Sequence, residues 1–168
     1  MTRIACVGIV AKPRLDAIAA HVAEIAAWLE ARGIEAVFEE GTAALAGFGP
    51  ERRRATREAL PDQVELLVVL GGDGTLLAVA DSVSRAGRNI PILGVNFGHL
   101  GFLAEIAWPE VFGALEDVLA GRAGIDERTM LHASVWRDGG QTGLWPALND
   151  VVITRGALSR ILELSVSV

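Results

Sequence analysis

Short apolar runs and amphipathic stretches alternate along the first part of the chain. Ile4–Val10 is a short run rich in β-branched residues, which predicts a strand buried on both faces, as in a parallel sheet. Leu15–Ala31 carries apolar residues three and four positions apart and is followed by Gly33, which predicts a helix with a glycine stop. Ile34–Phe38 predicts a second strand. The order strand–helix–strand is typical of a layered α/β fold with a right-handed crossover.

The same alternation continues to about residue 120. It predicts the strands Val64–Leu70 and Ile90–Val95 and the helices Leu76–Ala86 and Val111–Leu119. Thr75 is placed to cap the first of these helices. Residues 41–63 are less regular, and within them ERRRATREAL (51–60) predicts a short, very basic helix. That helix could present a solvated face, as most charge runs do, or it could face an anion over a cleft.

After Gly121 apolar and polar residues alternate with a period of two. Leu131–Trp136, Leu144–Thr154 and Ile161–Val168 alternate as strands do, with GGQTG (139–143) as a hairpin turn between the first two. The sequence therefore predicts a layered α/β domain with a parallel sheet over residues 1–122, followed by the start of an antiparallel all-β domain over 123–168. Because the last strand runs to the end of the chain with nothing after it to pair with, we expect a truncated β domain.

The charge balance excludes some classes of partner. Fifteen Lys and Arg against 21 Asp and Glu give a net charge of −6, which argues against broad binding to nucleic acid or an anionic membrane. Cys6 is the only cysteine, so no intrachain disulfide and no cysteine metal site is expected. The apolar run at the N-terminus is too short for a secretory signal, and no run approaches the ~20 apolar residues of a membrane span. We expect a cytoplasmic protein.

The segment GGDGT (71–75) lies between a predicted buried strand and a predicted helix. In an open α/β sheet, ligands collect at the carboxyl ends of strands, and glycines there let backbone N–H groups approach a phosphate. Asp73 would repel a phosphate, so its presence favours a base or a Mg²⁺ holder beside the phosphate. A plain turn is the alternative.

A second glycine-rich segment, GVNFGHLGFL (94–103), also follows a predicted strand. Phe97 is placed to stack on a nucleotide base or a nicotinamide ring, whereas Phe102, beside Leu103, is interpreted as a core residue. His99 and His132 are too far apart in sequence to indicate a metal site and are interpreted as structural.

Three segments in this order, GGDGT, GVNFGHLGFL and ALNDVVITRG (147–156), resemble the NAD kinase family over essentially the whole chain. GGDGT alone is shared with diacylglycerol, sphingosine and 6-phosphofructo-kinases, and the second segment narrows the resemblance. The resemblance implies transfer of the γ-phosphoryl group of ATP, or of polyphosphate, to the 2′-hydroxyl of the adenosine ribose of NAD. The alternatives are a GGDGT-type lipid kinase and a non-catalytic NAD-binding fragment.

The resemblance also implies residue roles. Asp73 would be the general base, and NAD would be bound by Asp73, Gly74, Phe97, Asn149, Asp150 and Arg160. Gly71, Gly72, Gly74 and Thr75 would form the phosphate-binding loop. The implied cofactor is Mg²⁺ or another divalent cation with ATP, with no organic cofactor because NAD is the substrate. The full-length protein would be a homo-oligomer, a dimer or a tetramer.

The chain departs from the family pattern at two places. Asp150 stands where a glutamate is usual, which shortens the reach of the carboxylate by one methylene. A second Gly-Asp-Gly and a Thr-Pro-Thr-Gly-Ser-Thr-Ala-Tyr run, which complete the family's site, do not occur in the 168 residues. We therefore expect residues 1–168 alone to be inactive.

Overall fold

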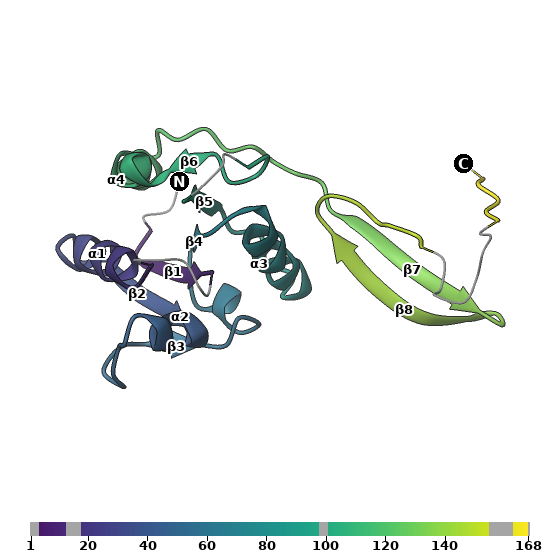
Figure 1. The fold of residues 1–168 in the computed structure, drawn as a ribbon, viewed down its shortest axis with the longest axis horizontal. Helices are drawn as coiled ribbons and strands as arrows, with labels where there is room; N and C mark the ends of the chain where they lie inside the picture. Colours follow the sequence, from purple (N-terminus) through teal and green to yellow (C-terminus); the bar gives the residue numbers. More distant parts are fainter. Residues whose placement is uncertain (1–3, 13–17, 98–100, 155–162, 168) are drawn as a thin grey trace.

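The computed structural model describes residues 4–12, 18–97, 101–154 and 163–167, and in these it contains two sheets (Figure 1). The larger sheet has six parallel strands in the order β3-β2-β1-β4-β5-β6. Their bounds are Cys6–Ala11 (β1), Glu35–Glu39 (β2), Arg54–Ala55 (β3), Leu66–Leu70 (β4), Ile92–Asn96 (β5) and Ile106–Ala107 (β6). The smaller sheet is an antiparallel hairpin of β7 (Leu131–Arg137) and β8 (Gly140–Ala147).

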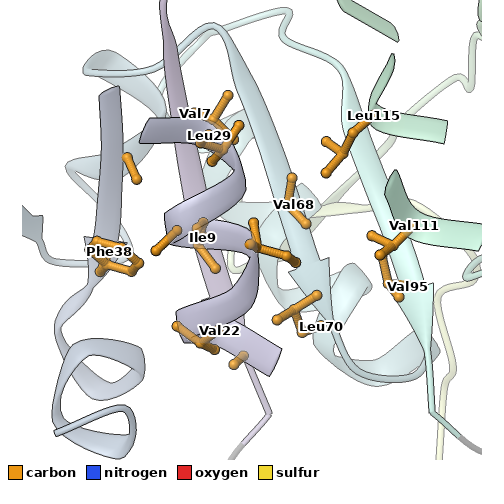
Figure 2. Close-up of a cluster of buried hydrophobic side chains, with 14 of the residues drawn as sticks. Val7, Ile9, Val22, Leu29, Phe38, Val68, Leu70, Val95, Val111 and Leu115 are labelled. Atoms are coloured by element: carbon orange, nitrogen blue, oxygen red, sulfur yellow. The ribbon is translucent and has the colours of Figure 1, made fainter. Parts of the chain in front are cut away.

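Helices cover both faces of the parallel sheet. They are α1 (Ile18–Glu30), α2 (Glu40–Leu45), α3 (Asp73–Arg85) and α4 (Val111–Leu119), with 3₁₀ turns at Leu60–Asp62 and Trp108–Glu110. Buried side chains of α1 and α4 pack on one face, as Figure 2 shows for Val22, Leu29, Val111 and Leu115. Buried side chains of α3 and the first 3₁₀ turn pack on the opposite face. The result is three layers, helix–sheet–helix.

Strand β4 shows why this sequence forms a central strand. All five of its residues are buried, and they divide between the two cores by alternation. Leu66, Val68 and Leu70 face the core under α1, whereas Leu67 and Val69 face the core under α3. A continuous run of Leu and Val is stable there because both faces of a parallel strand are covered.

The helices after β1 and β4 lie on opposite faces of the sheet, although these two strands are neighbours. The chain therefore diverges at the carboxyl ends of β1 and β4, which opens a crevice between them. In open α/β sheets this point is the usual place for a ligand.

The structure confirms the predicted fold class, a parallel α/β sheet followed by an antiparallel β unit. The predicted strands and helices up to Leu119 occur within a few residues of their expected bounds, with one exception. The helix predicted for residues 51–60 is wrong: these residues form a turn, the short strand β3 and the start of a 3₁₀ turn. Their arginines bind neighbouring elements individually, so they have no common helical face. Helix α2 and strand β6 were not predicted.

Helix α3 begins earlier than expected. Its first residue is Asp73 and its N-cap is Gly72, so Thr75 lies inside the helix and the prediction that Thr75 caps it is wrong. Gly72 has the extended backbone that is usual at an N-cap, and the helical backbone begins at the next residue.

The C-terminal strands also differ from the prediction. The hairpin turn consists of Asp138 and Gly139, both with positive φ, so β8 begins at Gly140 inside the predicted GGQTG turn. Strand β8 ends at Ala147, and residues 148–154 continue without regular structure, so the strand predicted to Thr154 is too long. Residues 163–167 are not in a strand either, which contradicts the prediction for that part of 161–168.

Figure 1 shows the hairpin extending away from the α/β layers, with much of its surface open to solvent. Within the residues that the structure describes, no helix has the length and apolar character needed to cross a membrane.

Candidate functional site

The loop after β4 is packed closely against the end of β1. The backbone N–H of Lys12 donates to the carbonyl oxygen of Leu70 at 2.8 Å, and the N–H of Gly71 donates to the carbonyl oxygen of Val95 at 2.9 Å. A Cβ at Gly71 would lie 2.7 Å from Oγ1 of Thr75 and 3.1 Å from Cβ of Lys12. Glycine is therefore required at this position so that the loop can lie beside both residues.

Asp73 joins the two glycine-rich segments. Its Oδ2 accepts the backbone N–H of Phe102 at 2.8 Å, and its Oδ1 accepts the N–H groups of Leu103 at 3.0 Å and Ala104 at 3.1 Å. A Cβ at Gly101 would lie 2.8 Å from Cγ of Asp73, so a glycine there lets the carboxylate reach the backbone. The aspartate of GGDGT thus holds the end of the GVNFGHLGFL segment in place.

These three hydrogen bonds also set the protonation state of the carboxylate. The N–H groups of Phe102, Ala104 and Leu103, in that order of effect, hold the pKa of Asp73 below its ordinary value. A carboxylate has about four lone-pair sites, so three N–H groups leave one site free, on Oδ2. Asp73 is therefore an ionised acceptor with one position left for an outside donor.

A cavity of about 390 Å³ opens at this crevice. Ala11 and Lys12 line it from the end of β1, residues 72–75 and Ala78 line it from the GGDG loop and α3, and Arg57 lines it from the segment after β3. A second cavity of about 680 Å³ opens at the amino ends of the strands, between residues such as Glu65, Arg88 and Gly121. Because the glycine motif and the divergence of the chain are both at the smaller cavity, we take the smaller one as the candidate site.

The two phenylalanines of the second glycine-rich segment differ in exposure, and only the interpretation of Phe102 is contradicted. Phe97 is half-buried; its ring stacks on Trp108 with centroids 5.4 Å apart and meets His21 edge-on at 4.9 Å. Phe102 is 80% exposed, so its interpretation as a core residue is wrong. Its backbone N–H donates to Asp73, while its side chain lies at the surface.

The structure does not bring Asn149 and Asp150 to this cavity. Asn149 and Asp150 follow the end of β8 rather than starting a strand, and both are exposed. The amide of Asn149 donates to Oδ1 of Asp150 at 3.4 Å, and neither residue lines the cavity. Arg160 lies outside the described residues.

The site offers little to a resident metal ion. Among the described residues there is no cluster of three or more His, Cys, Asp or Glu side chains. Of the described residues that line the cavity, Asp73 is the only one with a carboxylate. Mg²⁺ often binds through one or two carboxylates together with substrate phosphates. The described residues therefore fit a Mg²⁺ ion that arrives with a phosphate ligand and is held mainly by that ligand.

Sequence reasoning did not single out the two cations among the described lining residues, Lys12 and Arg57. A signal was available for Lys12, because it is the only lysine of the chain and directly follows the first strand. Arg57 was hidden among the other arginines of its segment, and only the fold separates it from them.

Comparison with known proteins agrees with the geometry. A family model described as the ATP-NAD kinase N-terminal domain matches residues 7–123. The chain is 46% identical to an NAD kinase of Syntrophotalea carbinolica over 145 residues, which is 86% of this chain and 50% of the relative. It is 44% identical to an NAD kinase of Geotalea daltonii over 168 residues, which is 100% of this chain and 56% of the relative.

A solved structure, "Crystal Structure of Yeast NADH Kinase complexed with NADH", has the same fold, with a TM-score of 0.74 and 22% identity, over 89% of this chain and 48% of that one. The chain spans about half the length of the curated relatives it matches. The family model covers well over half of the chain and includes both glycine-rich segments, so the chain belongs to the NAD kinase family.

Proposed function

We propose that the protein of which this chain forms at least part is an NAD kinase, which transfers the γ-phosphoryl group of ATP or polyphosphate to the 2′-hydroxyl of the adenosine ribose of NAD. The observation that carries the proposal is the position of Asp73. Its carboxylate fastens the two family segments together at the carboxyl edge of the sheet and lines the cavity there.

In the proposed reaction the 2′-oxygen forms a bond to the γ-phosphorus while the bond from that phosphorus to the bridging oxygen breaks. The diphosphate product, or the shortened polyphosphate, leaves with the electron pair of the broken bond, and the hydroxyl proton passes to a base. Such transfers depend mainly on alignment and on neutralising charge. A divalent cation bound with the donor supplies part of that neutralisation.

Asp73 is proposed as the proton acceptor. The free lone pair of Oδ2 is available to a hydroxyl, while the three backbone N–H groups fix the direction in which the carboxylate points. The same N–H groups lower its basicity. This suits a reaction in which orientation of the nucleophile contributes more than proton abstraction, as is typical of phosphoryl transfer.

The other proposed roles follow the family resemblance. Gly71, Gly72, Gly74 and Thr75 would form the loop around the phosphates, and Gly74 would also adjoin NAD. Phe97, Asn149, Asp150 and Arg160 would contact NAD. We also propose that the protein works in the cytoplasm, with NAD and ATP, and that the full-length form is a homo-oligomer. The half-exposed ring of Phe97 supports contact with a ligand on its open side, since its other contacts are to Trp108 and His21.

A ligand screen tests this function against its alternatives. The melting temperature is measured with NAD, NADP, ATP and a short-chain diacylglycerol, because a ligand that binds only the native state raises it. An NAD kinase is stabilised by the nucleotides and forms NADP in a coupled assay with the full-length protein. Stabilisation by diacylglycerol alone would indicate a lipid kinase. Stabilisation by NAD without NADP formation would indicate a binding module that lacks the reaction.

A further inference from the structure

Two cations face the GGDG loop across the candidate cavity, and neither is among the residues that the family segments single out. Lys12 comes from the end of β1 and Arg57 from the segment after β3. Among the described residues that line the cavity, these two are positively charged and Asp73 alone is negatively charged. The chain as a whole carries −6, so this local excess runs against its general charge.

The backbone of Lys12 is fixed beside the loop, whereas its side chain is exposed. Its backbone N–H donates to the carbonyl oxygen of Leu70 at 2.8 Å, and its Cβ lies against Gly71, which fixes the start of the side chain beside the loop. Lys12 is exposed, and its ammonium forms no ion pair with any carboxylate of the described residues. It is therefore available to an anion.

Arg57 is only partly satisfied within the protein. Its Nη2 lies 3.4 Å from Oε1 of Glu39, a long contact, while the other oxygen of Glu39 accepts the N–H and the hydroxyl of Thr42 at 2.8 and 3.0 Å. The Nε atom of Arg57 is buried and has no hydrogen-bond partner among the described residues. The Arg57 side chain is nevertheless 35% exposed, and its Nη1 group forms no hydrogen bond within the described residues, so Nη1 can donate to an anion in the cavity.

The other arginines of the same segment are engaged elsewhere. Arg52 pairs with Glu30, and Arg53 pairs with Glu35 at 2.9 Å and with Gln63 at 3.1 Å. Arg54 donates to the carbonyl oxygens of Phe48 and Gly49. Of the four arginines in residues 51–60, only Arg57 lines the cavity. The basic segment thus combines surface ion pairs with a single cation directed at the site.

We propose that Lys12 and Arg57 bind the phosphate chain of the phosphoryl donor over the GGDG loop. The proposal rests on the proposed function and adds two residues to it. An arginine guanidinium can donate two parallel hydrogen bonds to phosphate oxygens, and a lysine ammonium acts as a point charge. At Gly72 and Gly74 an added Cβ would meet nothing within 4 Å, so this side of the loop is open to a ligand. The ligand chemistry is a linear phosphate chain, which a nucleoside triphosphate and an inorganic polyphosphate share.

The test measures binding of inorganic tripolyphosphate, and separately of ATP with Mg²⁺, to the full-length protein by isothermal titration. Arg57→Gln and Lys12→Met are each expected to weaken binding of both ligands about ten- to a hundredfold, the usual effect of losing a hydrogen bond to a charged group. Arg57→Lys keeps the charge but loses the paired donors, so its loss should be smaller. The matched control is Arg53→Gln, which removes the same charge from the same segment but leaves the cavity lining intact. Melting temperatures of all variants verify that they are folded.

Three results would overturn the proposal: no binding of either ligand by the unaltered chain, unchanged affinity in folded Arg57→Gln and Lys12→Met, or an equal loss in Arg53→Gln. Tighter binding of ATP than of tripolyphosphate would indicate an additional contact to adenosine. It would support the proposal if Arg57→Gln still weakens binding of both ligands.

The proposed function is tested separately, by measuring NADP formation by the full-length protein. Phosphate binding that depends on Arg57 without NADP formation would reject the function and keep the subsite. NADP formation with an unchanged KM for the donor in Arg57→Gln would reject the subsite and keep the function.

Discussion

Asp73 combines two tasks at the scale of a single residue. It accepts the backbone N–H groups of Phe102, Leu103 and Ala104, and it lines the cavity in which we place the reaction. An asparagine has one oxygen in place of two, so Asp73→Asn would turn an NH₂ group toward at least one N–H donor and would also lose the base. The substitution therefore affects both the position of the loop and the proton transfer.

We predict that Asp73→Asn lowers the turnover number for NADP formation about 10²–10⁴-fold in the full-length enzyme, the usual range for loss of a general base. Asp81→Asn is the matched control, because Asp81 lies on the same helix and pairs with Arg85 at the surface. The measurement is a coupled NADP assay at saturating NAD and ATP. If Asp73→Asn keeps more than about half of the activity, Asp73 is not the base.

The depressed pKa of Asp73 also predicts how stability depends on pH. Because the pKa is lower in the folded state than in the unfolded chain, the unfolded state binds more protons between the two values. The stabilisation is complete above the unfolded pKa of about 4 and is lost as the pH falls through the folded pKa. Asparagine does not titrate, so the free energy of unfolding of Asp73→Asn should depend less on pH below about pH 4 than that of the wild type. Urea titrations of both proteins across this range measure the difference, and parallel curves would refute the assignment.

At the scale of elements, one buried threonine ties together β1, β2 and α2. Thr42 is fully buried; its hydroxyl accepts the backbone N–H of Ala11 at 2.8 Å and donates to Glu39 at 3.0 Å. We predict that Thr42→Val destabilises the protein by about 1–3 kcal/mol, because the isosteric valine leaves a buried N–H without an acceptor. Thr142→Val is the control, since that hydroxyl donates to the carbonyl oxygen of Val135 in an exposed hairpin where water can replace it. Urea unfolding of both variants tests this, and equal losses would contradict it.

At the scale of elements, the sequence predicted some strands but not the structure of the basic segment. Strand β4 was identifiable because Leu66–Leu70 is apolar on both faces, and such a run has few other stable environments. The basic segment 51–60 was not, because it has no apolar periodicity and its arginines bind partners distant in sequence, such as Glu30 and Glu35. The Asp138–Gly139 pair was itself a turn signal of the hairpin type, since both residues have positive φ.

The candidate site was predictable only in part for a similar reason. Glycine spacing marks a loop from local sequence alone, so GGDGT was identifiable. The hydrogen bonds from Phe102, Leu103 and Ala104 to Asp73 cross 29 to 31 positions, and no local pattern encodes them. The half-burial of Phe97 depends on its ring contacts with His21 and Trp108, which also lie far from it in sequence or outside its own segment.

At the scale of the whole molecule, the α/β layers and the hairpin differ in how much of their apolar surface is covered. The parallel sheet has helices on both faces, whereas Trp136 is 61% exposed and Leu144 is 54% exposed on the hairpin. A two-stranded hairpin has two open edges and is marginally stable by itself. The contrast supports the proposed boundary near residue 122 between an α/β domain and a β domain.

We predict from this contrast that purified residues 1–168 associate, while residues 1–122 remain monomeric and unfold cooperatively. Exposed apolar patches and open strand edges both favour contact between chains. Light scattering and sedimentation at several concentrations measure the association. A 1–168 variant with Trp136→Gln and Leu144→Gln serves as a control and should associate less, because it keeps the chain length but loses apolar surface.

The same samples are assayed for NADP formation, which we expect to be undetectable because Asn149 and Asp150 do not line the cavity that contains Asp73. A monomeric 1–168 chain with turnover comparable to that of the full-length enzyme would refute both expectations.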